Sequence, residues 1–502
     1  MKFESILDRK KNPHKDEIRP AFLLDLNLYQ IIDRISLYWG ENVSSMYYCL
    51  PADAACEDYR RAVFADIRQD GLYEALCAFT EKMKERRDAF GQKEEVTEKL
   101  QKAIWHVREA DCYCSAFRQL DQTLGRAALQ SEGMLALREY LQEYTASERF
   151  VRMSEQADGI LTEMGAFRLT LTYENDRIWV VQEETGSGYD DFLEACFPGQ
   201  GRRMKSPFGA IGKLTELEQE LLKSFRKRNP EFFEKVETFY KDYAEYASDT
   251  LIRFASEIRY YLSFYRFEQK MREKGYSFAA PAVSREETEA QGLYDLALAC
   301  AEGVRREDIV SNDLVYRPGE LFFVLTGPNQ GGKTTFARSL GQLVYFTKMG
   351  LDVPAISARV QNFSTIMTHF SVEESVETGR GRLKEELMRL APMMDTVHGV
   401  QREAFVILNE LFTTAANYDA CMMGKRVLEH FIELGCRGIY VTHLRELAQA
   451  HPQVVSLWAM LDEQGRHTFK IARSEAGDSA GAAALAEKHG LTYKQLKERC
   501  GS

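Results

Sequence analysis

The pattern of hydrophobic and polar positions changes near residue 305 and divides the chain into two regions. Before that point, apolar residues recur every three or four positions over long stretches, which is typical of amphipathic helices. One early stretch runs from Leu24 to Leu37, and one face of a helix there would carry Leu28, Ile31, Ile32 and Ile35. Beyond residue 305, short apolar runs alternate with helical stretches, as in an α/β fold with a largely parallel sheet. The pattern therefore predicts a mostly helical region followed by an α/β domain.

One segment of the helical region has a different period. Apolar and polar residues alternate in Phe167–Tyr173 and again in Arg177–Val181, and the turn-forming pair Asn175-Asp176 lies between these two runs. Alternation on both sides of such a pair is typical of a β-hairpin. We therefore expect two short antiparallel strands here, as a small β element in an otherwise helical region.

A long helical stretch follows, from Leu214 to Lys274, and the pattern predicts an interruption only around Asn229-Pro230. Its recurring apolar positions include Phe232, Val236, Phe239, Tyr240 and Tyr243. This length exceeds that of an ordinary globular helix and favours one or two arm-like helices. A compact bundle with ordinary turns has the same periodicity, so it stays open as the alternative.

The composition is that of a soluble globular protein, with 45% hydrophobic and 28% charged residues in a chain of 502. No stretch approaches the roughly 18 uninterrupted apolar residues of a membrane helix, and the N-terminus lacks the apolar core of a signal peptide. We therefore expect a cytoplasmic protein without a membrane partner. The ten cysteines lack metal-ligand spacing, because Cys112 and Cys114 have only His106 nearby. They are expected to be reduced thiols.

The net charge of −11 argues against a protein that coats nucleic acid through bulk electrostatics. A contact with DNA would therefore have to be local. The segment Phe197–Lys205 contains Arg202, Arg203 and Lys205, which could contact phosphates. The same composition suits a solvated surface loop, and the sequence leaves both interpretations open.

The strongest chemical signal is the glycine-rich stretch Thr326–Thr335, which contains the pattern G-x-x-x-x-G-K-[ST]. The apolar run Leu321–Leu325 before it is typical of a buried parallel strand, and Thr335–Phe346 after it has helical spacing. Strand, loop and helix thus follow in the order that a site for a nucleoside triphosphate requires.

Each residue type in this loop suits the binding of phosphate groups for a physical reason. Glycine at positions Gly327, Gly331 and Gly332 lets backbone N–H groups surround phosphates at the N-terminus of a helix. Lys333 can reach the β- and γ-phosphates, and the Thr334 hydroxyl can bind Mg²⁺. The loop therefore predicts ATP-type chemistry.

Two further apolar runs end in polar residues that could complete this site. Asn409-Glu410 follows Phe405–Leu408, and Thr442-His443 follows Gly438–Val441. In open α/β sheets, ligands bind at the carboxyl ends of the strands. Glu410 is the candidate for orienting or deprotonating the attacking water. The amide oxygen of Asn409 can bind Mg²⁺ but carries no negative charge, so a weaker metal affinity is expected.

Together these elements resemble the MutS family of DNA mismatch-repair ATPases. Thr326–Thr335 is similar to that family's TGPN-x-GGKST loop, and the match includes Pro328, Asn329 and Thr335. Three more elements are similar to family motifs: Ser311–Asp313 to PND, Asn409–Asp419 to DE…GTSTYDG and Val441–Leu447 to the ATHYFEL switch. The resemblance covers residues 305 to 500 and, more weakly, residues 214 to 283.

The resemblance implies a P-loop ATPase domain that binds ATP and Mg²⁺, with Thr334 and Asn409 at the metal, Glu410 at the water and His443 sensing the γ-phosphate. It also implies a homodimer in which each ATPase domain completes the other's nucleotide site. The expected domains are a helical core at 1–130, a helical and β-hairpin insertion of clamp-like type at 131–212, lever helices with a return to the core at 213–305, and the ATPase domain at 306–502.

Some features depart from the family pattern. The family's trans-acting SGRSTF…E signature is matched by Thr378, Gly379, Arg380 and Glu386, but Gly381 replaces the serine expected to contact the partner's γ-phosphate. Asn409 stands where an aspartate is usual, so weak hydrolysis is expected. The first forty residues also lack the Phe-x-Glu wedge that stacks on a mispaired base. We therefore expect a shortened bacterial MutS-related protein without the N-terminal mismatch-recognition domain.

The leading hypothesis is an ATP-dependent, nucleotide-switched dimeric clamp that recognises DNA structure rather than sequence, in repair or recombination. The alternative is a nucleotide-binding switch with slow or no hydrolysis, whose state a protein partner reads. Asn409, Gly381 and the acidic charge favour this alternative. An ATPase of the structural-maintenance type fits less well, because no sustained heptad repeat occurs.

Overall fold

The structure is a computed structural model, and it describes residues 3–9, 20–96, 98–174, 177–183, 216–370, 382–400 and 403–474. The chain forms two compact units. The first contains residues 1–6 and 66–259, and the second contains residues 7–65 and 260–502. Two of the three boundaries fall within helices, α3 (Ala54–Ile67) and α11 (Asp249–Glu273). Among the described residues, no helix combines the length and apolar character that crossing a bilayer requires.

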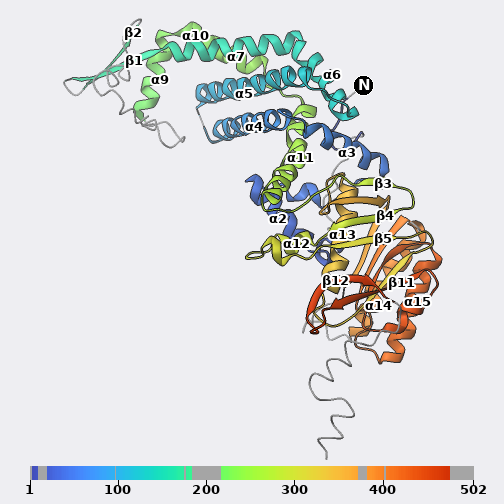
Figure 1. Cartoon of the computed structure of the whole chain (residues 1–502). Coiled ribbons are helices and arrows are strands. Elements are labelled where there is room, and N and C mark those ends of the chain that lie inside the picture. Colours follow the sequence, from blue (N-terminus) through green and yellow to red (C-terminus); the bar gives the residue numbers. More distant parts are fainter. Residues whose placement is uncertain are drawn as a thin grey trace, which may run out of the picture. The chain divides into compact units, whose positions relative to one another are not determined.

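The first unit is mostly helical. Its helices are α4 (Leu72–Glu95), α5 (Lys99–Arg126), α6 (Glu132–Ala146), α7 (Glu148–Ala166), α9 (Glu216–Arg228) and α10 (Pro230–Asp242). Helices α4 and α5 lie side by side (Figure 1), and α5 also packs against α7 and α10. Serine side chains begin two of the helices, because Ser131 accepts a hydrogen bond from the Met134 N–H and Ser147 from the Phe150 N–H.

The predicted β-hairpin is confirmed. Strands β1 (Arg168–Glu174) and β2 (Arg177–Glu183) pair antiparallel, with Arg168 opposite Glu183 and Glu174 opposite Arg177. Two residues connect the strands, which is a common hairpin connection.

The long helical stretch after residue 214 differs from the prediction in one respect. The break at Asn229-Pro230 is present, but a second break at residues 243–248 separates α10 from α11. The sequence did contain a signal for this break, namely a serine at position 248, a residue type that favours helix N-caps. In the structure the Ser248 hydroxyl accepts a hydrogen bond from the Leu251 N–H at 3.4 Å, as an N-cap residue does. Helix α10 buries Phe232, Phe233, Val236 and Phe239 and packs against α5 and α7. Residues 230–242 therefore belong to a compact bundle, as the alternative had it, and the prediction of an arm-like helix is wrong for them.

The second unit is built on a six-stranded sheet in the order β12, β11, β6, β10, β9, β8. The strands are β6 (Phe322–Thr326), β8 (Thr365–Phe370), β9 (Ala404–Asn409), β10 (Arg437–Val441), β11 (Val454–Leu461) and β12 (His467–Arg473). Neighbouring strands are parallel from β8 to β11, and only β12 is antiparallel, at the edge. The predicted largely parallel sheet is confirmed.

Helices cover both faces of this sheet, as its continuously apolar strands require. On one face, α14 (Arg382–Val400) and α15 (Asn417–Glu433) share a core with Val324, Val406 and Leu408. On the other face, α13 (Lys333–Met349) approaches so closely that a Cβ on Gly341 would lie 2.8 Å from Ile407 and 2.4 Å from Leu26. These layers fix the N-terminus of α13 at the carboxyl edge of the sheet (Figure 1).

A second sheet in this unit was not predicted. It has the order β3 (Ala282–Ser284), β7 (Ser357–Gln361), β4 (Thr288–Leu293), β5 (Asn312–Tyr316). Because β3 and β4 precede residue 305, the strand-containing part of the chain begins earlier than the pattern indicated. The remaining short elements are α1 (Phe22–Asp25), η1 (Ser44–Tyr47), α12 (Leu296–Ala299), η2 (Arg306–Asp308) and η4 (Arg445–Gln449). Helix α2 (Leu28–Trp39) buries Leu28, Ile31, Ile32 and Ile35, as predicted.

A buried ion pair joins α3 to α13. The Lys348 ammonium lies 2.5 Å from the Glu57 carboxylate and donates to the Phe363 carbonyl at 2.6 Å. Burial raises the pKa of Glu57, and the Lys348 charge opposes this effect. We expect Lys348→Met to destabilise the protein by about 3–5 kcal/mol, because it leaves a buried carboxylate unpaired. The double variant Lys348→Met/Glu57→Gln should recover most of the loss in denaturant unfolding. Equal stability of Lys348→Met and the wild type would contradict this.

Candidate functional site

The glycine-rich loop connects β6 to α13 in a conformation that its glycines permit. Gly327 has φ of 134°, and a Cβ there would lie 2.9 Å from the Cβ of Ala459 and 3.0 Å from its backbone nitrogen. Gly332 has φ of 84° and immediately precedes the first residue of α13. Any larger side chain at Gly327 would force the loop away from β11. The loop thus presents its backbone at a helix N-terminus, where N–H groups favour anions.

Lys333 begins α13 and is buried, with only 5% of its surface exposed. Its ammonium donates to two carbonyls of the loop, those of Gly327 at 3.1 Å and Pro328 at 3.0 Å. Burial lowers the pKa of Lys333, and the charge of Glu410 acts in the opposite direction. A buried cation held by neutral carbonyls is well placed to gain from an arriving anion.

Thr334 and Asn409 are brought together from α13 and the end of β9. The Thr334 hydroxyl donates to the Asn409 side-chain oxygen at 3.2 Å, and Asn409 is 6% exposed. Hydroxyl and amide oxygens are ligands that Mg²⁺ accepts. The two side chains therefore fit a magnesium ion, although neither contributes negative charge.

Glu410 and His443 meet at the ends of β9 and β10. The His443 Nε2 atom lies 3.0 Å from Glu410 Oε1, and the two side chains are 47% and 30% exposed, respectively. Glu410 has a positive φ of 54°, and its N–H donates to the Val441 carbonyl at 2.8 Å. This turn carries the carboxylate past the strand end, toward the loop and Lys333.

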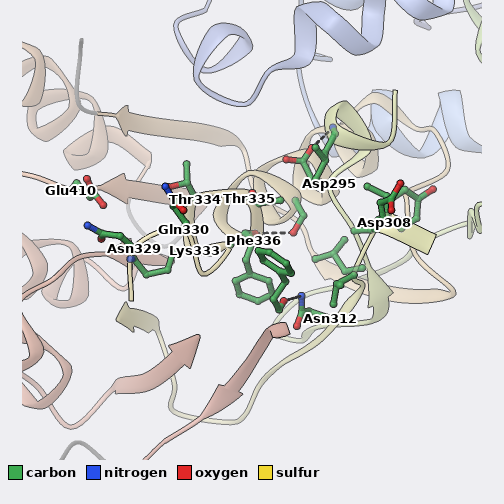
Figure 2. A pocket seen from close by; sticks show the side chains of 18 of the residues that line it. Asp295, Asp308, Asn312, Asn329, Gln330, Lys333, Thr334, Thr335, Phe336 and Glu410 are labelled. Carbon is green, nitrogen blue, oxygen red and sulfur yellow. Dashed lines mark hydrogen bonds between the residues drawn. The ribbon is translucent and has the colours of Figure 1, made fainter. Parts of the chain in front are cut away.

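Of these side chains, those of Lys333, Thr334, Glu410 and His443 line one end of a cavity of about 460 Å³. Figure 2 shows Lys333, Thr334, Asn329 and Glu410 toward one side, and Asp295, Asp308 and Asn312 on the other. The other lining residues include Leu293, Tyr294, Leu298, Ile309, Val310, Gln330, Thr335, Phe336, Ser339 and Phe469. A volume of this size accommodates a small-molecule ligand.

Asn312 closes the far wall of this cavity. Its amide nitrogen donates to the Phe469 carbonyl at 3.2 Å, and its side-chain oxygen accepts from the Ile471 N–H at 2.8 Å. The sequence indicated Ser311–Asp313 through a family motif, but not what Asn312 contacts. It did not identify Asp295, Asp308 or Phe469, which reach the cavity from elements distant in the chain.

Some of the predicted residues lie outside the part of the chain that the structure describes. They include Thr378, Gly379, Arg380 and Gly381 of the trans-acting signature, and Arg202, Arg203 and Lys205 of the basic segment. Glu386 of the same signature is described, and its carboxylate is buried and accepts a hydrogen bond from the Phe412 N–H at 3.1 Å.

This geometry defines an α/β domain with a cavity at the carboxyl ends of its parallel strands. The family model described as MutS domain V matches residues 323–488, which contain the loop and both strand ends. Over these residues the chain matches the MutS family, and the resemblance drawn from the sequence is confirmed for this part of the chain.

Curated relatives agree with this assignment over part of their length. The chain is 26% identical over 197 residues to the DNA mismatch repair protein msh-2 of Neurospora crassa, covering 38% of this chain and 21% of the relative. It is 34% identical over 137 residues to MSH6 of Arabidopsis thaliana, covering 26% and 10%, and 28% identical over 181 residues to MutS of Thermotoga neapolitana, covering 35% and 22%. The matched regions thus span between a tenth and about a fifth of these relatives.

Proposed function

We propose that residues 306–502, within the second unit, form a P-loop ATPase domain that binds ATP with Mg²⁺ and hydrolyses it slowly. The observation that carries this proposal is the convergence of Lys333, Thr334, Glu410 and His443 at one end of a cavity large enough for a nucleotide, with Asn409 hydrogen-bonded to Thr334 beside it. Three separate strand ends contribute these groups. The MutS domain V match over the same residues supports the proposal.

Each group has a distinct part in this mechanism. Loop N–H groups and the Lys333 ammonium bind the phosphates, and Lys333 exchanges its two carbonyl partners for phosphate oxygens. Thr334 and Asn409 would hold Mg²⁺, which would supply positive charge to offset that of the phosphates. Glu410 orients a water molecule and accepts its proton, and His443 fixes the Glu410 carboxylate from the adjacent strand.

The cavity also offers a place for the rest of the nucleotide. Phe469 has an aromatic ring for stacking, while Asp308 and Asp295 add polar groups on the wall opposite the loop. Stacking on an aromatic ring favours a base without demanding one identity. These groups favour a nucleoside triphosphate, rather than inorganic phosphate alone, as the ligand of the cavity.

Asn409→Asp tests the metal part of the mechanism. The carboxylate would keep the acceptor for the Thr334 hydroxyl and add the charge that Asn409 lacks, so Mg²⁺ should bind more tightly. We expect half-maximal turnover at roughly tenfold lower Mg²⁺, equivalent to about 1.4 kcal/mol. A Mg²⁺ titration of ATPase rate measures this, with Asn362→Asp as the control. An unchanged titration would remove Asn409 from the metal site.

We also propose that the chain acts on DNA as a homodimer, as a nucleotide-switched clamp that recognises DNA structure. The names of the three relatives, all DNA mismatch-repair proteins, support DNA as the ligand class. The test is steady-state ATPase and binding across duplex, mismatched, branched and single-stranded DNA at low salt, with sedimentation to measure dimerisation by ATP. DNA-stimulated turnover is expected. Absence of binding to all four would exclude the DNA proposal and leave the ATPase proposal standing.

A second candidate function is a nucleotide-binding switch that hydrolyses ATP slowly or not at all and is read by a protein partner. The amide of Asn409 favours this second candidate, because the pair of Thr334 and Asn409 offers Mg²⁺ no carboxylate. ATP-dependent dimerisation with no turnover, with or without DNA, is the outcome that would select this candidate.

A further inference from the structure

The turn after β9 has an unusual backbone. Glu410 and Phe412 both have positive φ values, of 54° and 60°, and neither is glycine. Left-handed backbone is unfavourable for L-residues, so the surrounding structure must hold such a turn in place. The turn matters because it sets where the Glu410 carboxylate lies relative to Lys333 and His443.

Three contacts hold this turn. The Glu410 N–H donates to the Val441 carbonyl on β10 at 2.8 Å. The Phe412 N–H donates to the Glu386 carboxylate on α14 at 3.1 Å. The side chains of Leu411 and Phe412 are buried in the core that α14 and α15 share with the sheet. Of the two backbone N–H groups, only that of Phe412 donates to a side chain, and the Glu410 carboxylate adds its contact with His443.

Glu386 is itself held in place by contacts between α14 and β8. The His369 Nε2 atom lies 3.3 Å from the Glu386 carbonyl, and Arg389 donates to the Phe370 carbonyl at 3.0 Å. Burial and the charge of Arg389 lower the pKa of His369 to about 4, so its ring is neutral at pH 7 and can donate to that carbonyl. The chain of contacts runs from β8 through α14 to the turn.

We propose that Glu386 is a positioning residue for Glu410: its buried carboxylate binds the Phe412 N–H, keeps the left-handed turn, and so aims Glu410 at the water in the nucleotide site. This inference rests on the proposed ATPase function. Without the carboxylate, the buried Phe412 N–H would lose its partner, and the turn would be free to relax. Glutamine would keep an oxygen acceptor at the same reach.

The test compares Glu386→Ala, Glu386→Gln and the neighbouring control Glu385→Ala in the full chain. We expect Glu386→Ala to lower turnover by about 10- to 100-fold, as small misplacements of catalytic groups do. Its affinity for a fluorescent ATP analogue should change less than about threefold, since Glu386 does not line the cavity. Glu386→Gln and Glu385→Ala should both stay near wild type.

Hydrogen exchange of the peptide that contains Phe412 gives a second measurement that needs no turnover. Its amide protection should fall in Glu386→Ala and persist in Glu386→Gln. Unchanged protection in Glu386→Ala would overturn the inference whatever the ATPase rate. Lost protection with wild-type turnover would overturn it as well. If the wild type itself hydrolyses no ATP, the proposed hydrolysis fails, and the Glu386 contact is then judged by exchange alone.

Discussion

Lys333→Ala is expected to reduce ATP affinity by about 100-fold. The ammonium is a charge-assisted donor, and such a bond contributes about 1.5–3 kcal/mol, or roughly 10- to 100-fold in binding. The upper end applies because the side chain is 5% exposed and shielded from water. Turnover should fall with binding, as should any dimerisation or DNA response that depends on ATP. Equilibrium binding of a fluorescent ATP analogue measures the effect directly.

A second variant and a control distinguish loss of charge from loss of geometry. Lys333→Arg keeps the charge, but its planar fork cannot occupy the place of an ammonium that donates to Gly327 and Pro328, so little rescue is expected. Lys425→Ala removes an exposed lysine on α15 and should bind ATP as the wild type does. Wild-type affinity in Lys333→Ala would place the nucleotide elsewhere and remove the basis of the proposed function.

The parts of the fold that the sequence predicted well depend on local patterns. The strand β6, the glycine-rich loop and α13 are adjacent in the chain, and continuous apolar residues give a buried strand a clear signature. The second sheet lacks such a signature. Strand β3 has three residues, none of them buried, and it pairs with β7 more than 70 residues later. Pairing over that distance is set by packing of the whole unit, which no short window contains.

The two ends of the candidate site differ in the same way in how far the sequence predicts them. Lys333, Asn409 and Glu410 could be predicted to meet, because parallel strands direct their carboxyl ends to one edge of a sheet. The rest of the cavity lining could not, since Asp295 follows β4 of the second sheet and Phe469 lies on the antiparallel edge strand. Their approach depends on how two sheets pack together. The predicted domain boundaries at residues 130, 212 and 305 stay predictions.

Glu410→Gln is expected to abolish most hydrolysis while leaving ATP bound. A positioned general base contributes about 10²- to 10⁴-fold to a rate, so single-turnover hydrolysis should slow by at least about 100-fold. ATP affinity should not fall, because Glu410 is proposed to contact the attacking water rather than the nucleotide. Its negative charge repels phosphate and does not attract it. The amide can still contact His443 at 3.0 Å, so the turn is expected to keep its conformation.

The binding and rate measurements together decide the role of Glu410. Glu433→Gln, on the exposed side of α15, is the matched control and should hydrolyse ATP at the wild-type rate. Trapping of ATP in Glu410→Gln would also favour a stable closed dimer, which sedimentation can detect. If Glu410→Gln hydrolysed ATP normally, His443 would be the remaining candidate at the strand ends, because it is the titratable side chain in contact with Glu410. The positioning role of Glu386 would then lose its purpose, since the turn it holds would carry no catalytic group.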